Sequence, residues 1–484
     1  MTAMMGSKRA NSMPPVFRTR YLWLLATGLL FGCATFQPRP ISPATSLKAY
    51  ESRSLASPGL ARFMAANHIA WPGQARPWDL KALTLASFYY EPALGYARAQ
   101  LLAAQAARIT ARARPNPSLS LSPGYDSGVP GVRTPWIVPL TIDWPIETAG
   151  RRGDRRAQAR HLAAAARWHL AGTAWGVRSR LRHALLALYG ARQTASLEAR
   201  QELALRRVAS LLEGQFRAGA VSSYTVTQAR IVLEHAILAR QAQAGRIRQA
   251  RIALAGSIGV PVSALRGVHL SFAGFRRFPR DLTRPVVRQQ ALLGRSDVRA
   301  ALAQYAASQS ALKLEIARQW PDIALGPGYA WNAQLVGDQR WQLGLSLTMP
   351  VLNQNQGPIA QAKARRRVAA AQFLSVQAAA ITQIDGALAA YRSALTQVRT
   401  ADTLLGNLTH QLNAIRAEVR AGELQPLDLA NAEVAFVDGA QNQLATRLAA
   451  QQALGALQNA VQSPLTLRPS VLHSAQNIPH PKGP

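Results

Sequence analysis

The sequence of 484 residues is poor in cysteine and in acidic side chains. Its one cysteine, Cys33, excludes a disulfide within the chain and a zinc site built from several cysteines. Aspartate and glutamate number 23 against 56 lysines and arginines, which gives a formal net charge of +33. Such a balance indicates an acidic partner, such as nucleic acid or anionic lipid.

Motifs of common catalytic sites are absent as well. The chain has no phosphate-binding glycine loop with lysine, no paired-histidine zinc motif and no nucleophile elbow. His161, His169 and His183 fall in one long helical stretch, but their spacing is not the four-residue spacing of a helical metal pair. We therefore expect no enzyme activity, no cofactor and no resident metal.

Residues 1–32 have the pattern of a signal peptide. Basic residues precede an apolar run from Tyr21 to Phe31, which is too short to span a bilayer, since that takes about 20 apolar residues. The segment that ends at Cys33 resembles the lipobox of bacterial lipoproteins, which implies lipid attachment at Cys33. The alternative is an ordinary signal peptide with an incidental cysteine. Residues 33–78, rich in Pro, Ser and Ala, are expected to form an extended arm.

Two stretches, at 117–146 and 321–351, carry apolar residues at every second position, which predicts two pairs of β-strands. In the first stretch Trp136 and Trp144 bracket three aliphatic residues on one face, about 26 Å apart along a strand. This matches the apolar band and aromatic girdles of an outer-membrane barrel. Trp341 is the counterpart in the second stretch. The alternative is a soluble β-layer packed on helices.

Helical spacing surrounds both strand pairs and repeats in the same order. Long apolar-periodic stretches are expected at 151–217 and 360–420, and each is followed by a glycine turn and a returning helix. The expected domains are a first structural repeat at 79–262, a second at 285–465, and a disordered tail at 466–484.

This duplicated order resembles the TolC-type outer-membrane efflux channels, and the N-terminal arm is similar to that of the heavy-metal (cobalt–zinc–cadmium) branch. Pro145 and Pro350 match the family's strand-to-helix junctions. The resemblance covers nearly the whole mature chain. It implies a mainly α fold with a small membrane β part, in which a trimer forms a 12-stranded outer-membrane β-barrel continued by a long α-helical periplasmic tunnel.

The resemblance also implies partners and sites. The partners are two further copies of the chain, a periplasmic adaptor (membrane fusion) protein, an inner-membrane pump of the resistance-nodulation-division type and outer-membrane lipid. The tips expected to contact the adaptor are Ala218, Gly219, Val221, Ala421, Gly422 and Leu424. The residues expected to line the periplasmic aperture are Asp428, Asn431, Thr225 and Gln228.

Asp428 has two readings, because an acidic residue near the start of a helix also caps that helix. Two basic clusters at the starts of the long helices have two readings as well: contact with lipid headgroups, or solvated helix surface. They consist of Arg151, Arg152, Arg155 and Arg156, and of Lys363, Arg365, Arg366 and Arg367.

The function expected from these features is passive export through an exit duct of a tripartite efflux pump, with heavy-metal cations among the candidate substrates. The alternative is a basic coiled-coil scaffold that binds nucleic acid, which the charge alone would favour. The secretory signal and the aromatic-flanked strands oppose that alternative, so we expect no nucleic-acid partner.

Overall fold

The computed structural model describes residues 35–462 except for 74, 126–135, 280–283 and 333–338. The predicted signal peptide, Cys33 and the tail at 466–484 therefore lie outside the described residues. The chain divides into two compact units, Met1–Ser52 and Arg53–Pro484. In its described part the first unit contains one helix, α2 (Pro43–Glu51), and the second contains everything discussed below.

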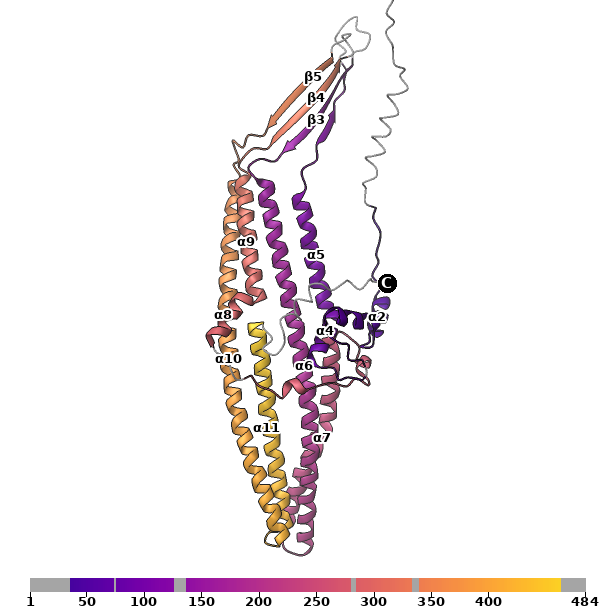
Figure 1. The fold of residues 1–484 in the computed structure, drawn as a ribbon, viewed down its shortest axis with the longest axis vertical. Helices are drawn as coiled ribbons and strands as arrows, with labels where there is room; N and C mark the ends of the chain where they lie inside the picture. The colour runs from indigo at the N-terminus through magenta and orange to yellow at the C-terminus, as the bar shows by residue number, and fades with distance from the viewer. Residues whose placement is uncertain (1–34, 74, 126–135, 280–283, 333–338, 463–484) are drawn as a thin grey trace, which may run out of the picture. The chain divides into compact units, whose positions relative to one another are not determined.

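The second unit repeats one order of elements twice (Figure 1). The first repeat runs through α4 (Leu80–Tyr90), α5 (Pro92–Arg112), a strand region, α6 (Arg151–Arg217) and α7 (Ser223–Ile258). The second runs through α8 (Arg284–Gly294), α9 (Ser296–Ala317), a strand region, α10 (Gln356–Ala421) and α11 (Pro426–Val461). The predicted duplication of helix, strand pair and helical hairpin is confirmed.

All described strands form one antiparallel sheet. Its strands are β1 (Ser118–Leu121), β2 (Gly124–Tyr125), β3 (Trp136–Ile146), β4 (Ile323–Asn332) and β5 (Gln339–Leu347). The order is β1-β3-β4-β5, and β2 pairs with β3 beyond the end of β1. The contact between β3 and β4 therefore joins the two repeats.

The two longest helices, α6 with 67 residues and α10 with 66, are about 100 Å long at 1.5 Å per residue. Neither has an internal proline after its first turn, so no backbone hydrogen bond is lost along the rod. The segment before the first strand pair forms two helices, α4 and α5, because Glu91 is extended before Pro92. The second repeat has a similar break, at Arg295 between α8 and α9.

The largest apolar core lies where α4, α6 and α7 meet the segment before them. Residues 33–78 differ from the expected extended arm, since α3 (Pro58–Ala66) lies within them and Leu60, Met64 and Trp78 are buried in this core. Trp78 also exchanges backbone hydrogen bonds with His269 and Ser271. Burial of large apolar side chains stabilises this arrangement, and the Pro- and Ser-rich composition did not reveal it.

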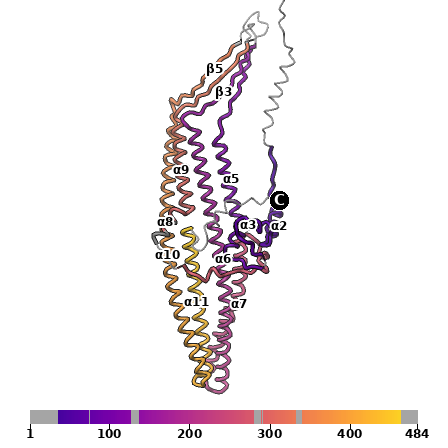
Figure 2. The backbone as a smooth tube through the Cα atoms, in the orientation of Figure 1, coloured from indigo at the N-terminus to yellow at the C-terminus, as the bar shows by residue number. Residues whose placement is uncertain are grey.

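The lower halves of the two hairpins, α6–α7 and α10–α11, pack through α6 and α11 (Figure 2). Polar pairs join them, including Arg207 to Glu433 at 2.6 Å and Gln201 to Asp438 at 2.8 Å. Gly190 of α6 leaves room for Leu448 of α11, whose Cδ1 would lie 2.9 Å from a Cβ at that glycine. Small residues thus allow the helices to approach closely.

A glycine pair tests this packing. Gly439 of α11 is buried, and a Cβ there would collide with Leu408 of α10, whereas a Cβ at Gly386 of α10 would meet nothing. We expect Gly439→Val to lower the free energy of unfolding by about 1–3 kcal/mol through overpacking. The matched change Gly386→Ala should raise it by about 0.5–1 kcal/mol, because alanine favours helix. Urea titration in detergent measures both, and equal effects would contradict this packing.

Candidate functional site

One face of the sheet is apolar and exposed. Strand pairing places Leu140, Tyr329 and Trp341 in one row, and Trp144, Leu325 and Leu345 in another. On β5 the side chains of Trp341 and Leu343 are 84% and 75% exposed. An exposed apolar face across several strands indicates contact with lipid rather than with water.

The aromatic residues fall on this same face. Trp136 and Trp144 lie toward opposite ends of β3 and both are exposed, as the alternation predicts. Trp341 pairs with Tyr329 and shares the row of Leu140, between the two β3 tryptophans. The register therefore places Trp341 opposite the middle of the β3 band, and its place in a girdle stays a prediction.

The other face of the sheet is polar and partly lined by glycine. Thr141, Gly328 and Gln342 share one row there. A Cβ at Gly328 would lie 2.9 Å from Nε2 of Gln342 and 3.1 Å from the carbonyl oxygen of Leu140, so any other residue would displace this side chain. Asp143 faces Gly326 in the same way, with Oδ1 3.2 Å from a Cβ placed there. This face has the polarity of a barrel interior.

The strand-to-helix junctions differ from the expected proline positions. Pro145 lies inside β3 and pairs with Ala324, and the chain turns later, at Ala149 and Gly150, both with positive φ. In the second repeat Pro350 follows β5, and the turn into α10 comes at Asn355, with φ 63°. The amide of Asn355 donates to the carbonyl oxygen of Glu315 at 2.8 Å, which holds this turn against α9.

Three arginines of the first basic cluster bind the ends of neighbouring helices. Arg151 donates to the carbonyl oxygens of Ala317 and Trp320 at the end of α9, and to Asp322 at 2.5 Å. Arg152 donates to the carbonyl oxygen of Arg112 at the end of α5. Arg155 donates to the carbonyl oxygens of the residues on either side, Ala111 and Ala113. Cations are favourable at the C-terminal ends of helices. At these three residues the side chains contact protein, and contact of this cluster with lipid headgroups stays a prediction.

Arg155 also pairs with Glu147 in the turn, at 2.5 Å and 3.0 Å. This hydrogen bond lowers the pKa of the Glu147 carboxyl. The first junction is thus clamped by charged groups from α6 onto the ends of α5 and α9.

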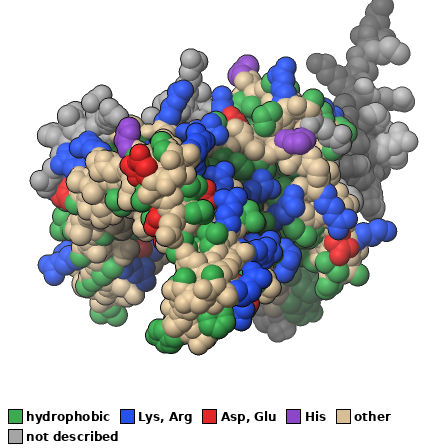
Figure 3. All heavy atoms as spheres, turned by 90° about the horizontal axis from the view of Figure 1, so that it is seen from below, with side chains coloured by type: hydrophobic (Ala, Val, Ile, Leu, Met, Phe, Trp, Pro, Cys, Tyr) green, Lys and Arg blue, Asp and Glu red, His purple; other side chains and the backbone are tan. Residues whose placement is uncertain are grey.

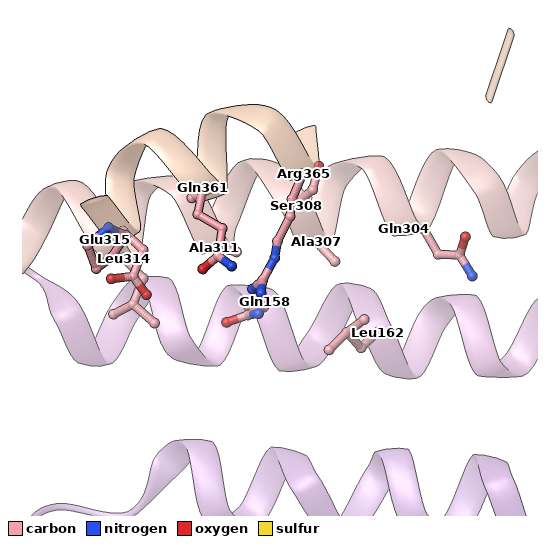
Figure 4. A pocket seen from close by; sticks show the side chains of 12 residues that line it. Gln158, Leu162, Gln304, Ala307, Ser308, Ala311, Leu314, Glu315, Gln361 and Arg365 are labelled. Atoms are coloured by element: carbon pink, nitrogen blue, oxygen red, sulfur yellow. The ribbon is translucent and has the colours of Figure 1, made fainter. Parts of the chain in front are cut away.

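The second basic cluster lies beside a cavity of about 300 Å³. The cavity is lined by both apolar and polar side chains of α6, α9 and α10. In Figure 4 the Arg365 side chain extends into it toward Gln158 of α6, with Gln361 beside it. Arg366 contacts Gln309 of α9 at 3.5 Å. Contact of this cluster with lipid stays a prediction.

Both tips have the same backbone geometry. Gly219 and Gly422 have φ of 74° and 82°, which only glycine adopts without strain. In each tip the backbone N–H of the residue after the glycine donates to a carbonyl oxygen in the last helical turn. Ala220 donates to Gln215 at 2.8 Å, and Glu423 donates to Glu418 at 2.9 Å. This is the Schellman motif. Of the other predicted tip residues, Ala218 and Ala421 are exposed, and Val221 and Leu424 are half-buried.

The predicted aperture residues lie in the first turns after the tips. Asp428 accepts a hydrogen bond from the backbone N–H of Gln425 at 3.0 Å, completing a capping box at the start of α11. The capping reading is therefore confirmed, and the exposed carboxylate remains available for a second role. Thr225 occupies the same position in α7, capped by Ser222. Gln228 and Asn431 are exposed one turn further along.

No candidate for chemistry appears near these features. Among the described residues, no group of three or more His, Cys, Asp or Glu side chains is placed to hold a metal ion. Of the three histidines of α6, His169 pairs with Gln304 at 3.1 Å. Desolvation lowers the pKa of His161.

A family model described as outer membrane efflux protein matches residues 90–260 and 287–461. The chain belongs to the outer membrane efflux protein family. Membership confirms the predicted class, an efflux channel of the outer membrane that extends into the periplasm. The two matched segments coincide with the two structural repeats. A comparison with curated protein sequences finds no match.

Solved structures of outer-membrane proteins have a similar fold. CusC is 18% identical, with 80% of this chain and 92% of that chain covered at a TM-score of 0.64. VceC of Vibrio cholerae is 17% identical, with 79% of this chain and 96% of that chain covered at a TM-score of 0.64. The channel OprN is 19% identical, with 90% and 99% covered at 0.64. At these identities the likeness shows the shared efflux-channel fold alone.

The clamp at the first junction can be tested on one arginine. We expect Arg151→Gln to lower the free energy of unfolding by about 2 kcal/mol, because charged hydrogen bonds to Asp322 and to the end of α9 are lost. Arg156, exposed on the same helix, is the matched control, and Arg156→Gln should change it by less than about 0.5 kcal/mol. Urea titration in detergent measures both. Similar losses would mean that total charge matters rather than the clamp.

Proposed function

We propose that this chain is the exit duct of a tripartite efflux pump and that it works as a homotrimer. The observation that carries the proposal is the open sheet. β1 and β5 are its edges, each with one side unpaired among the described strands, and the face between them is exposed and apolar. In hydrocarbon an unpaired backbone group costs several kcal/mol, so such a sheet must close.

Closure requires further copies of the chain. One copy supplies four strand positions, since β1 and β2 occupy the same side of β3. Single-chain bacterial barrels have at least eight strands. Three copies would give twelve, the number that the TolC-type resemblance implies. Contact between copies would also cover α10, whose most apolar stretch is only 17% buried in one chain.

The helices would continue the barrel as a passive tunnel through the periplasm. In this proposal the tip glycines Gly219 and Gly422 and their neighbours contact a periplasmic adaptor, which links the duct to an inner-membrane pump of the resistance-nodulation-division type. Support comes from the two exposed Schellman tips, which present the same backbone shape twice. Lipid attachment at Cys33 would anchor the chain beside its barrel.

We propose a cation as cargo, with heavy-metal ions as the leading class. In a trimer Asp428 would form a ring of three carboxylates near the tips, in a chain of net charge +33. A carboxylate ring attracts cations and repels anions. Figure 3, a view from the tip end, shows lysines and arginines gathered around the hollow of the chain, so such a ring would oppose the prevailing charge.

The trimer can be tested by cross-linking the two sheet edges. Cysteines at Ser120 of β1 and Ser346 of β5 should be joined between neighbouring copies by a short bis-maleimide, because closure brings β1 of one copy beside β5 of the next. The expected gel pattern ends at three chains. Either cysteine alone should give no ladder. A ladder beyond three chains, or none from the double variant, would refute the closed trimer.

The aperture role of Asp428 can be separated from its capping role. Asp428→Asn removes the charge but keeps an oxygen for the Gln425 N–H. We expect reconstituted channels of this variant to lose cation preference and block by multivalent cations, with thermal stability unchanged. Glu423→Gln, an exposed change at the same tip, is the control and should keep both properties. Unchanged selectivity with a loss of about 1 kcal/mol in stability would make Asp428 a cap only.

A further inference from the structure

Two buried arginines lie on α6 in the second unit. Arg178 and Arg182 lie one turn apart on α6 and are 2% and 6% exposed. Residues four apart on a helix share a face, so the two cations are neighbours and repel each other. Neither forms any of the ion pairs found between described residues. Buried cations without a carboxylate are costly and need another source of compensation.

Arg182 has neutral compensation. Its guanidinium donates to the carbonyl oxygen of Gln451 at 2.8 Å and to Oε1 of the same residue at 2.7 Å. The Gln451 amide in turn donates to the carbonyl oxygen of Phe275, and the Phe275 ring lies under the guanidinium at 5.4 Å. Gly455 of α11 leaves the space that Arg182 occupies, since a Cβ there would collide with Nη1.

Arg178 has no comparable partners. Its Nε and Nη2 are buried without a hydrogen bond, although the Trp175 ring lies 5.3 Å from its guanidinium carbon. Stacking on a ring compensates the flat face of a guanidinium but leaves the N–H groups at its edge unpaired. Burial lowers the pKa of Arg178 to about 10, so the group stays cationic at neutral pH. The unpaired donors therefore belong to a full positive charge.

A second unpaired group lies nearby. Gly190 and Arg182 of α6 face Leu448 and Gly455 of α11, which shows that the two helices run antiparallel. One turn beyond Gly455, Gln458 thus reaches the level of Arg178. Its side chain is 2% exposed and its Oε1 has no hydrogen-bond partner. Because an amide can be turned end for end, Gln458 can present either an acceptor or two donors there.

A cavity of about 650 Å³ lies beside this cluster, at Arg182 and Gln458. Its lining includes Arg182, Gln458, Lys81, Arg277 and one carboxylate, Asp79. Oδ1 of Asp79 is engaged with the backbone N–H of Ala82 as the cap of α4. Cations outnumber acids around this cavity, and a cavity of one sign raises the local concentration of the opposite ion.

We propose that Arg178, with Gln458, holds a small inorganic anion between α6 and α11. The anion accepts hydrogen bonds from the Nε and Nη2 edge of Arg178, and Gln458 donates its amide to the same ion. Arg178 and Gln458 are both 2% exposed, so we restrict the proposal to a monatomic anion such as a halide. The site joins the first repeat to the second, since α6 and α11 belong to different repeats. It is independent of the trimer and of the aperture proposed above.

Anion exchange at constant ionic strength tests the site on the full-length protein in detergent. Sodium bromide replaces sodium gluconate, whose anion is too large to enter. We expect the apparent melting temperature of the wild type to rise saturably by about 2–4 °C, as for a ligand that binds only the folded state. Arg178→Met should show no rise, and in gluconate it should melt no lower than the wild type, because an uncompensated buried charge has been removed.

Arg180→Met is the matched control, since the Arg180 side chain is 57% exposed and pairs with Glu91. It should keep the full bromide response. A wild type that does not respond, or an Arg178→Met variant that responds as fully as wild type, overturns the proposal. If Arg178→Met does not fold, anomalous diffraction from wild-type crystals grown in bromide decides: a peak within hydrogen-bond distance of the Arg178 guanidinium supports the site, and water alone there overturns it.

Discussion

In hydrocarbon no water is available to accept or donate hydrogen bonds, so a strand edge must find another strand. The order β1-β3-β4-β5 leaves two such edges in one chain, at β1 and at β5. Two contacts join the repeats that carry this sheet. The β3–β4 contact joins the repeats in the membrane, and the α6–α11 contact joins them again below it. The two repeats therefore form one continuous unit rather than two independent hairpins.

Apolar clusters and close approach together hold the helices in place. The main apolar core lies in the region of α4, α6 and α7, and a second cluster with Ile384, Tyr391 and Leu454 joins α10 to α11. Glycines such as Gly190 and Gly439 allow the helices to approach closely. Polar pairs such as Arg207 with Glu433 then set the register of the helices. The chain has fewer acidic side chains than basic ones, so several arginines donate to backbone carbonyl oxygens instead, as Arg152 and Arg182 do.

The sequence predicted the repeated elements well, because their signals are local. Period-two alternation identified the strands, and the absence of proline predicted α6 with the bounds that the structure has. The capping of α11 by Asp428 was also foreseen as one reading. Other features depend on residues distant in sequence. Arg151 binds Ala317 at the end of α9 and Asp322 just beyond it, 166 and 171 positions away, and the burial of Trp78 depends on the loop at 269–271.

The candidate sites were predicted less completely, for the same reason. Pro145 drew attention to the junction, but the turn lies at Ala149 and Gly150, where positive φ decides the direction of the chain. Arg178 and Arg182 looked like two more arginines on a basic helix, and their spacing gave no sign of burial. Arg182 is removed from water by Gln451 and Gly455 of α11 and by Phe275, all distant from it in sequence.

The two junctions also differ in length. Four residues, Glu147 to Gly150, connect β3 to α6 and are clamped by Arg151 and Arg155, whereas eight residues, Thr348 to Asn355, connect β5 to α10. We therefore expect a torque on the helices to reach the sheet more through the short, clamped link than through the longer one, because a longer connection bends more easily. In mechanical terms the first link is the stiffer coupling and the second the more compliant one.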